Sequence, residues 1–173
     1  MTIQDRKTGW LTPTFHCDFR EILAHTMFRC GLCCPLYCCM TDHFHLLWMG
    51  ISDGADQRAA AKYFRKHLNA ALKASGACLQ QQAYDHVLRE DERQRVAFES
   101  AAEYIARNPE RAGLVKEDCF RDYPFTGCVV PGFPELRPWQ EDYWDRFWRI
   151  YAHLRDHGLM RVRGEDEGEC ASA

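Results

Sequence analysis

Apolar positions in the first part of the chain recur at helical spacing. Between residues 12 and 32 they fall mostly at intervals of three or four residues. Thr12 or Thr14 can cap the start of a helix, Pro13 suits its first turn, and Gly31 can end it. This segment is therefore predicted to be an amphipathic helix.

The next two segments are short apolar runs, which are typical of strands. Residues 35–40 and 43–50 are separated by a two-residue polar turn, and together they predict a β-hairpin. Residues 57–75 follow, rich in alanine, lysine and arginine. They predict a strong helix that stops at Gly76.

The second half of the chain adds a strand and two helical regions. Residues 78–89 can form a strand, and residues 91–115 predict a helix that is interrupted before Pro109, because the residue before proline avoids the α region. Residues 123–158 predict a loop punctuated by proline and glycine, followed by an aromatic helix whose rings pack in the core. The order of elements predicts an α+β fold, with an antiparallel sheet and helices packed on one face.

Length and composition fit one globular domain. The chain has 173 residues, of which 46% are hydrophobic and 27% are charged. We expect a domain over residues 1–155 and a disordered acidic tail over residues 156–173. The sequence contains no apolar run of about eighteen residues and no signal-peptide pattern, so we expect no membrane span and a cytoplasmic location.

Cysteine is frequent, and half of the ten cysteines fall between residues 30 and 39. Without a secretion signal, these thiols are expected to be reduced and to act as small apolar side chains or as metal ligands. Cys30 and Cys33 have the spacing of half a zinc site, but no second pair at the usual spacing completes it. A zinc-stabilised interaction module therefore stays open as an alternative.

The overall charge does not indicate a nucleic-acid-binding protein, since the formal net charge is −3. Charge is distributed unevenly, however. The predicted helix over residues 57–75 carries Lys62, Arg65 and Lys66 and no acidic residue. This basic helix could pair with backbone phosphates, or it could simply be a solvated face.

Two histidines and a tyrosine–asparagine pair are the candidate chemistry. His43 and His45 are two apart on a predicted strand, so their rings point to the same side. Two imidazoles alone make an incomplete metal site and require a third ligand. Tyr104 and Asn108 are four apart and share one face of a predicted helix. Taken singly, each residue has a structural explanation as a strand, core or capping residue.

Five blocks of sequence carry a resemblance to a known family. In order they are CPLYCCMTDHFHLLWMG, AAKYFRKHLN, YDHVLREDE, YIARNPERAGLV and YPFTG, and the similarity covers residues 11–148. The chain resembles the HUH-type tyrosine transposases that act on single-stranded DNA, in particular the REP-associated tyrosine transposases. The histidine-hydrophobic-histidine strand together with the tyrosine-asparagine-proline helix is the most specific part of this resemblance.

The resemblance implies a ferredoxin-like sheet and a metal-dependent single-stranded DNA endonuclease and strand transferase. His43, His45 and Asn108 would bind Mg²⁺ or Mn²⁺, and Tyr104 would be the nucleophile that forms a 5′-phosphotyrosine intermediate. The substrate would be single-stranded DNA containing a hairpin, bound by a monomer or a homodimer. The side chains expected to contact DNA are Lys62, Arg65, Lys66 and Arg111.

In such a fold the first strand lies in the middle of the sheet, next to the histidine strand. Residues 1–7 look like only the last part of that strand, so the first strand is expected to be truncated or to begin further upstream. A sheet that lacks a central ladder would lose activity before it lost its fold. A catalytically inactive DNA-binding relic of the same family is therefore the second functional hypothesis.

Overall fold

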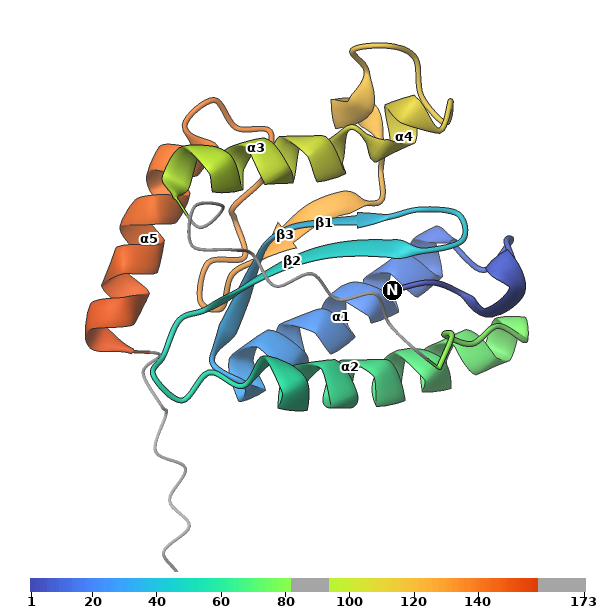
Figure 1. The fold of residues 1–173 in the computed structure, drawn as a ribbon, viewed down its shortest axis with the longest axis horizontal. Coiled ribbons are helices and arrows are strands. Elements are labelled where there is room, and N and C mark those ends of the chain that lie inside the picture. The colour runs from blue at the N-terminus through green and yellow to red at the C-terminus, as the bar shows by residue number, and fades with distance from the viewer. Residues whose placement is uncertain (82–93, 159–173) are drawn as a thin grey trace, which may run out of the picture.

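The computed structural model describes residues 1–81 and 94–158. Its antiparallel sheet has the strand order β2-β1-β3, with β1 in the centre (Figure 1). β1 spans Leu32–Cys39 and β2 spans Phe44–Gly50, and they form the predicted hairpin. β3 spans Thr126–Val129. The α+β class is confirmed, and the arrangement is consistent with a ferredoxin-like fold.

α1 (Pro13–Arg29) and α2 (Gln57–Leu72) cover one face of the sheet (Figure 1). Thr12 caps α1 by accepting a hydrogen bond from the backbone N–H of Phe15, as predicted. Asp56 caps α2 in the same way. The apolar sides of both helices meet the sheet in one core, whose fully buried members include Phe19, Leu23, Phe44, Phe64 and Leu68.

α3 (Arg95–Ala106) and α5 (Tyr143–His157) pack on the opposite face. The prediction that helices lie on one face therefore holds for α1 and α2 only. The reason lies in β1, all of whose residues are buried, so both of its faces need a cover. The aromatic side chains of the C-terminal region pack in this second layer, as predicted: Trp139, Tyr143, Trp144, Phe147, Trp148 and Tyr151.

β3 is a strand in a region that was expected to be a loop, and the expectation was wrong there. Its residues pair with the free edge of β1, and the register places Cys34 opposite Val129 and Cys38 opposite Thr126. The strand is only four residues long and contains Gly127, a residue that weakens strands. Pairing with β1 therefore decides its conformation more than its own sequence does.

The first three residues pair with two distant segments. Thr2 forms an antiparallel bridge with His43, and Ile3 forms another with Leu79. The extended pairing ends there, because Gln4–Arg6 form a short 3-10 turn, η1. The N-terminus thus supports the start of β2 at the position where the predicted first strand would lie.

The predicted break of the third long helix is also present. α3 ends at Ala106, and the short helix α4 (Asn108–Arg111) follows with Pro109 in its first turn. α5 continues to His157, past the predicted domain boundary at residue 155. Most of the predicted strand over 78–89, and the tail from residue 159 onward, lie outside the described residues.

Five of the described cysteines are buried and pack as small apolar side chains: Cys33, Cys34, Cys38, Cys39 and Cys128. All cysteines among the described residues are free thiols. Burial raises the pKa of the Cys38 and Cys128 thiols to about 11, so both stay protonated at neutral pH. No helix within residues 1–81 and 94–158 has the length and apolar character needed to cross a bilayer.

Candidate active site

The rings of His43 and His45 converge on one point, as their spacing predicts. Their Nε2 atoms are 2.9 Å apart, while Phe44 between them is buried in the core on the other face. Two nitrogens bound next to each other on a metal, with bonds of about 2.1 Å, are separated by about 3 Å. The pair therefore fits two adjacent positions of a metal ion, although the same distance also allows a hydrogen bond between the rings.

A carboxylate stands directly behind the first imidazole. Oδ1 of Asp42 lies 2.6 Å from Nδ1 of His43, and Oδ2 accepts a hydrogen bond of 2.8 Å from Arg6. A carboxylate can only accept, so Nδ1 of His43 must be the donor. In the neutral ring, the lone pair of His43 then lies on Nε2, which faces His45.

Burial and nearby positive charge both act on the ring of His45. Burial is the main reason why the pKa of His45 is lowered to about 4, and nearby positive charge, including that of Arg111, contributes in the same direction. His45 is therefore neutral at physiological pH, which is the form that binds metals. The same local positive charge favours an anion such as a phosphate at this point.

The packing of α3 brings its C-terminal turn to the histidine end of the hairpin. Ile105 packs against the cluster that contains Cys38 and Met40. Cys38 is the register partner of His45, so both side chains point to the face that α3 covers. The end of α3 that carries Tyr104 therefore lies over the half of the sheet that carries the histidines.

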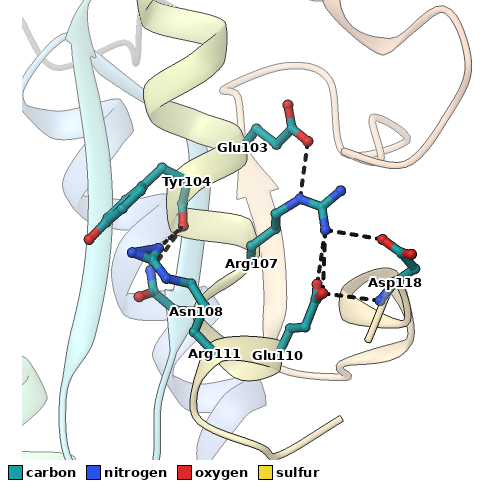
Figure 2. A network of polar contacts seen from close by, with 7 residues as sticks. All are labelled: Glu103, Tyr104, Arg107, Asn108, Glu110, Arg111 and Asp118. Carbon is teal, nitrogen blue, oxygen red and sulfur yellow. Dashed lines mark hydrogen bonds and ion pairs between the residues drawn. The ribbon is translucent and has the colours of Figure 1, made fainter. Parts of the chain in front are cut away.

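Tyr104 precedes the break between α3 and α4 and Asn108 follows it, and their side chains project from the same side of the two helices (Figure 2). Tyr104 is 58% exposed, so its side chain is accessible from solvent. Nδ2 of Asn108 donates to the carbonyl of Ile105 at 2.9 Å and approaches the carbonyl of Tyr104 at 3.3 Å. Because its amide nitrogen is held by the helix, the Oδ1 atom of Asn108 is the end available as a ligand.

Arg111 holds the tyrosine in place from the following helix. Its guanidinium lies 3.8 Å from the centre of the Tyr104 ring, and its Nη1 donates to the Tyr104 carbonyl at 3.3 Å. The charge of Arg111 also acts on His45, so this cation lies near both the tyrosine and the histidines. Arg111 was expected to contact DNA; the structure shows contacts that brace the turn, and a DNA contact stays a prediction.

Arg107 fixes the angle between α3 and α4 from the other side of the break (Figure 2). It pairs with Glu103 in α3, Glu110 in α4 and Asp118 in the next loop, at 3.2, 3.1 and 3.4 Å. Its guanidinium also lies over the Phe120 ring. This network orients the turn that presents the tyrosine and the asparagine.

The basic residues of α2 are not brought to this site. α2 lies on the face of the sheet opposite the histidine rings. Lys62 and Lys66 are exposed there, while Arg65 is half-buried and donates to the backbone carbonyls of Gln80 and Gln81. Arg65 therefore has a structural role in this fold, and a DNA contact by Lys62 or Lys66 stays a prediction.

The proposed zinc pair is likewise not brought together. Cys30 packs against the core under α1 and α2, whereas Cys33 belongs to the cluster under α5 on the other face. Within the described parts of the chain, no group of three or more histidine, cysteine, aspartate or glutamate side chains is placed to hold a metal ion. The third ligand implied by the resemblance, Asn108, is an amide and lies outside those residue types.

Sequence reasoning missed three residues that shape the site: Asp42, Arg6 and Arg107. Asp42 could have been found, since an acidic residue next to a candidate ligand is a natural hydrogen-bond acceptor for its ring. Arg6 is 36 residues away from Asp42 and gives no local signal.

In comparisons with protein-family models, curated proteins and solved structures, nothing matches this chain.

Proposed function

We propose that this chain is a metal-dependent endonuclease and strand transferase that acts on single-stranded DNA in the cytoplasm. The observation that carries the proposal is the meeting of two elements distant in sequence. The paired Nε2 atoms of His43 and His45 and the Tyr104–Asn108 turn come from different parts of the chain and share one face of the sheet. This arrangement supports the roles that the resemblance implies.

The residues present fit a divalent cation. Two imidazole nitrogens converge, one backed by a carboxylate, and the turn that carries Asn108 follows the helix that covers this face of the sheet. We favour Mg²⁺ or Mn²⁺ from the resemblance, since imidazole ligands by themselves also suit Zn²⁺. When bound, the cation would polarise the scissile phosphate and offset charge at the leaving oxygen.

Residues of the chain itself would position the tyrosine and the phosphate and carry out the transfer. Arg111 holds the Tyr104 ring, and its charge favours a phosphate near His45. The Tyr104 oxygen would form a bond to phosphorus while the bond from phosphorus to the 3′ oxygen breaks. The phenol proton would leave to solvent, and the 3′ oxygen would take up a proton. Because one phosphodiester replaces another, a 3′-OH could reverse the step without an energy source.

The direct test is capture of a covalent adduct. The protein is incubated with Mn²⁺ and hairpin-containing single-stranded DNA labelled at its 3′ end, and adducts are resolved under denaturing conditions. Tyr104→Phe should abolish the labelled band while the affinity for DNA stays unchanged. Tyr104 is exposed, so removal of its hydroxyl should not disturb the fold.

The matched control is Tyr63→Phe, which removes a hydroxyl from α2 on the other face. It should leave adduct formation intact. An adduct that persists in Tyr104→Phe would refute Tyr104 as the nucleophile. DNA binding by the wild type without any adduct would instead favour the inactive DNA-binding relic, and the absence of both would refute the family assignment.

A further inference from the structure

Asp42 sits between a charged side chain and a candidate metal ligand. One of its oxygens accepts from Nδ1 of His43 at 2.6 Å, and the other accepts from Nη1 of Arg6 at 2.8 Å. The carboxylate is mostly shielded, with 17% of its side chain exposed. Both of its oxygens are therefore occupied by donors that require an acceptor.

The backbone that presents Arg6 is unusual. Asp5 and Arg6 adopt φ angles of 55° and 49°, a left-handed conformation that side-chain-bearing residues rarely adopt. The turn is held from its other side by Lys7, whose Nζ donates to the carbonyls of Ser75 and Gly76 after α2. A disfavoured backbone conformation that neighbouring contacts hold in place indicates that the position of the Arg6 side chain is important to the protein.

We propose that Asp42, oriented by Arg6, is a positioning residue that keeps the His43 proton on Nδ1 and so keeps the Nε2 lone pair aimed at the ligand position. This inference rests on the metal site of the proposed function and deepens it. A carboxylate behind a ligating histidine fixes both the tautomer and the ring orientation. Here the orienting contact extends to the N-terminal turn, so that η1 and β2 together shape the site.

The chemistry of an amide provides a selective test. Asp42→Asn keeps the shape of the side chain but leaves one acceptor oxygen for two donors. Arg6 is charged and forms the stronger hydrogen bond, so it should take the oxygen. The amide N–H₂ then faces Nδ1 of His43 and forces its proton to Nε2, where it blocks a metal. Removing the competitor with Arg6→Met should let the oxygen turn back to His43.

The experiment measures two properties of the full chain. The first is Mn²⁺ affinity, followed by the spin-resonance signal of free Mn²⁺, for the wild type, D42N, R6M and the double variant D42N/R6M. We expect D42N to weaken binding about ten- to a hundredfold. R6M loses only the contact that orients Asp42, so it should bind Mn²⁺ more weakly than the wild type but more tightly than D42N. The double variant should bind more tightly than D42N alone. The second is the tautomer of His43 without metal, from long-range nitrogen–proton correlations.

The outcomes separate the two proposals. Recovery in the double variant, together with a shift of the His43 proton to Nε2 in D42N only, supports the inference, because a general loss of structure would not be rescued by a second substitution. Equal binding by D42N and the wild type, or a double variant as weak as D42N, overturns it while leaving the metal site standing. A wild type that binds no Mn²⁺, or binds it equally after His45→Ala, overturns the metal site and this inference with it. Melting temperatures confirm that each variant is folded.

Discussion

The imidazole of His16 lies between α1 and the sheet, among aromatic rings. Its centre is 5.3 Å from the Phe125 ring and 5.7 Å from the Tyr37 ring, and its Nε2 lies 3.1 Å from the Tyr37 hydroxyl. Burial, with a smaller effect from the charge of Arg20, lowers the pKa of His16 from 6.5 to about 4. The folded protein therefore resists protonation of this ring, whereas the unfolded chain does not.

The sign of the pH dependence follows directly. Above about pH 6.5 both states hold a neutral His16, and the ring adds no pH dependence. As the pH falls from about 6.5 towards about 4, only the unfolded state takes up the proton, so the free energy of unfolding decreases. The shift corresponds to at most about 3 kcal/mol, and because the ring is only partly buried we expect about 1–2 kcal/mol.

The assay compares urea unfolding of the wild type and His16→Gln at about pH 7 and about pH 5. Glutamine can still hydrogen-bond to the Tyr37 hydroxyl but does not titrate. The variant should lose about 1 kcal/mol less stability than the wild type across this range. His25→Gln, on the exposed part of the same helix, is the matched control for the loss of a histidine from α1. Parallel losses in the wild type and His16→Gln would refute the reasoning.

Two further predictions concern α3 and the site. Ala102 is 1% exposed where α3 meets the sheet, so Ala102→Leu should lower the free energy of unfolding by about 1–3 kcal/mol and reduce adduct formation. Ser100→Leu, on the exposed side of α3, is the control and should change neither property. Equal denaturation midpoints for the two variants would contradict the packing described. Arg111→Gln should reduce adduct formation and lower the salt dependence of DNA binding by about 0.7 in logarithmic slope, the value for one phosphate contact on a single strand. Arg20→Gln, an exposed cation of α1 on the opposite face, is its control, and an unchanged slope in Arg111→Gln would exclude a phosphate contact by this side chain.

The sequence by itself determined the elements whose signals are local. Thr12 and Pro13 start α1, Gly76 ends the helical region after α2 in a left-handed conformation, and Pro109 breaks the third long helix. Each of these effects depends on a residue's own backbone preference or on a contact within one helical turn, so a linear pattern reveals it. The shared direction of the His43 and His45 rings belongs to the same class, because strand geometry fixes it.

Tertiary structure decided everything that depends on which segments meet. β3 exists because β1 offers a free edge, and α3 takes the second face because β1 is apolar on both sides. The Arg6–Asp42 contact, the placement of Tyr104 over the histidine end of the sheet and the separation of α2 from that site likewise join residues far apart in the chain. Their energies come from long-range packing and pairing, which no local pattern records, so only the folded chain brings these residues together or keeps them apart.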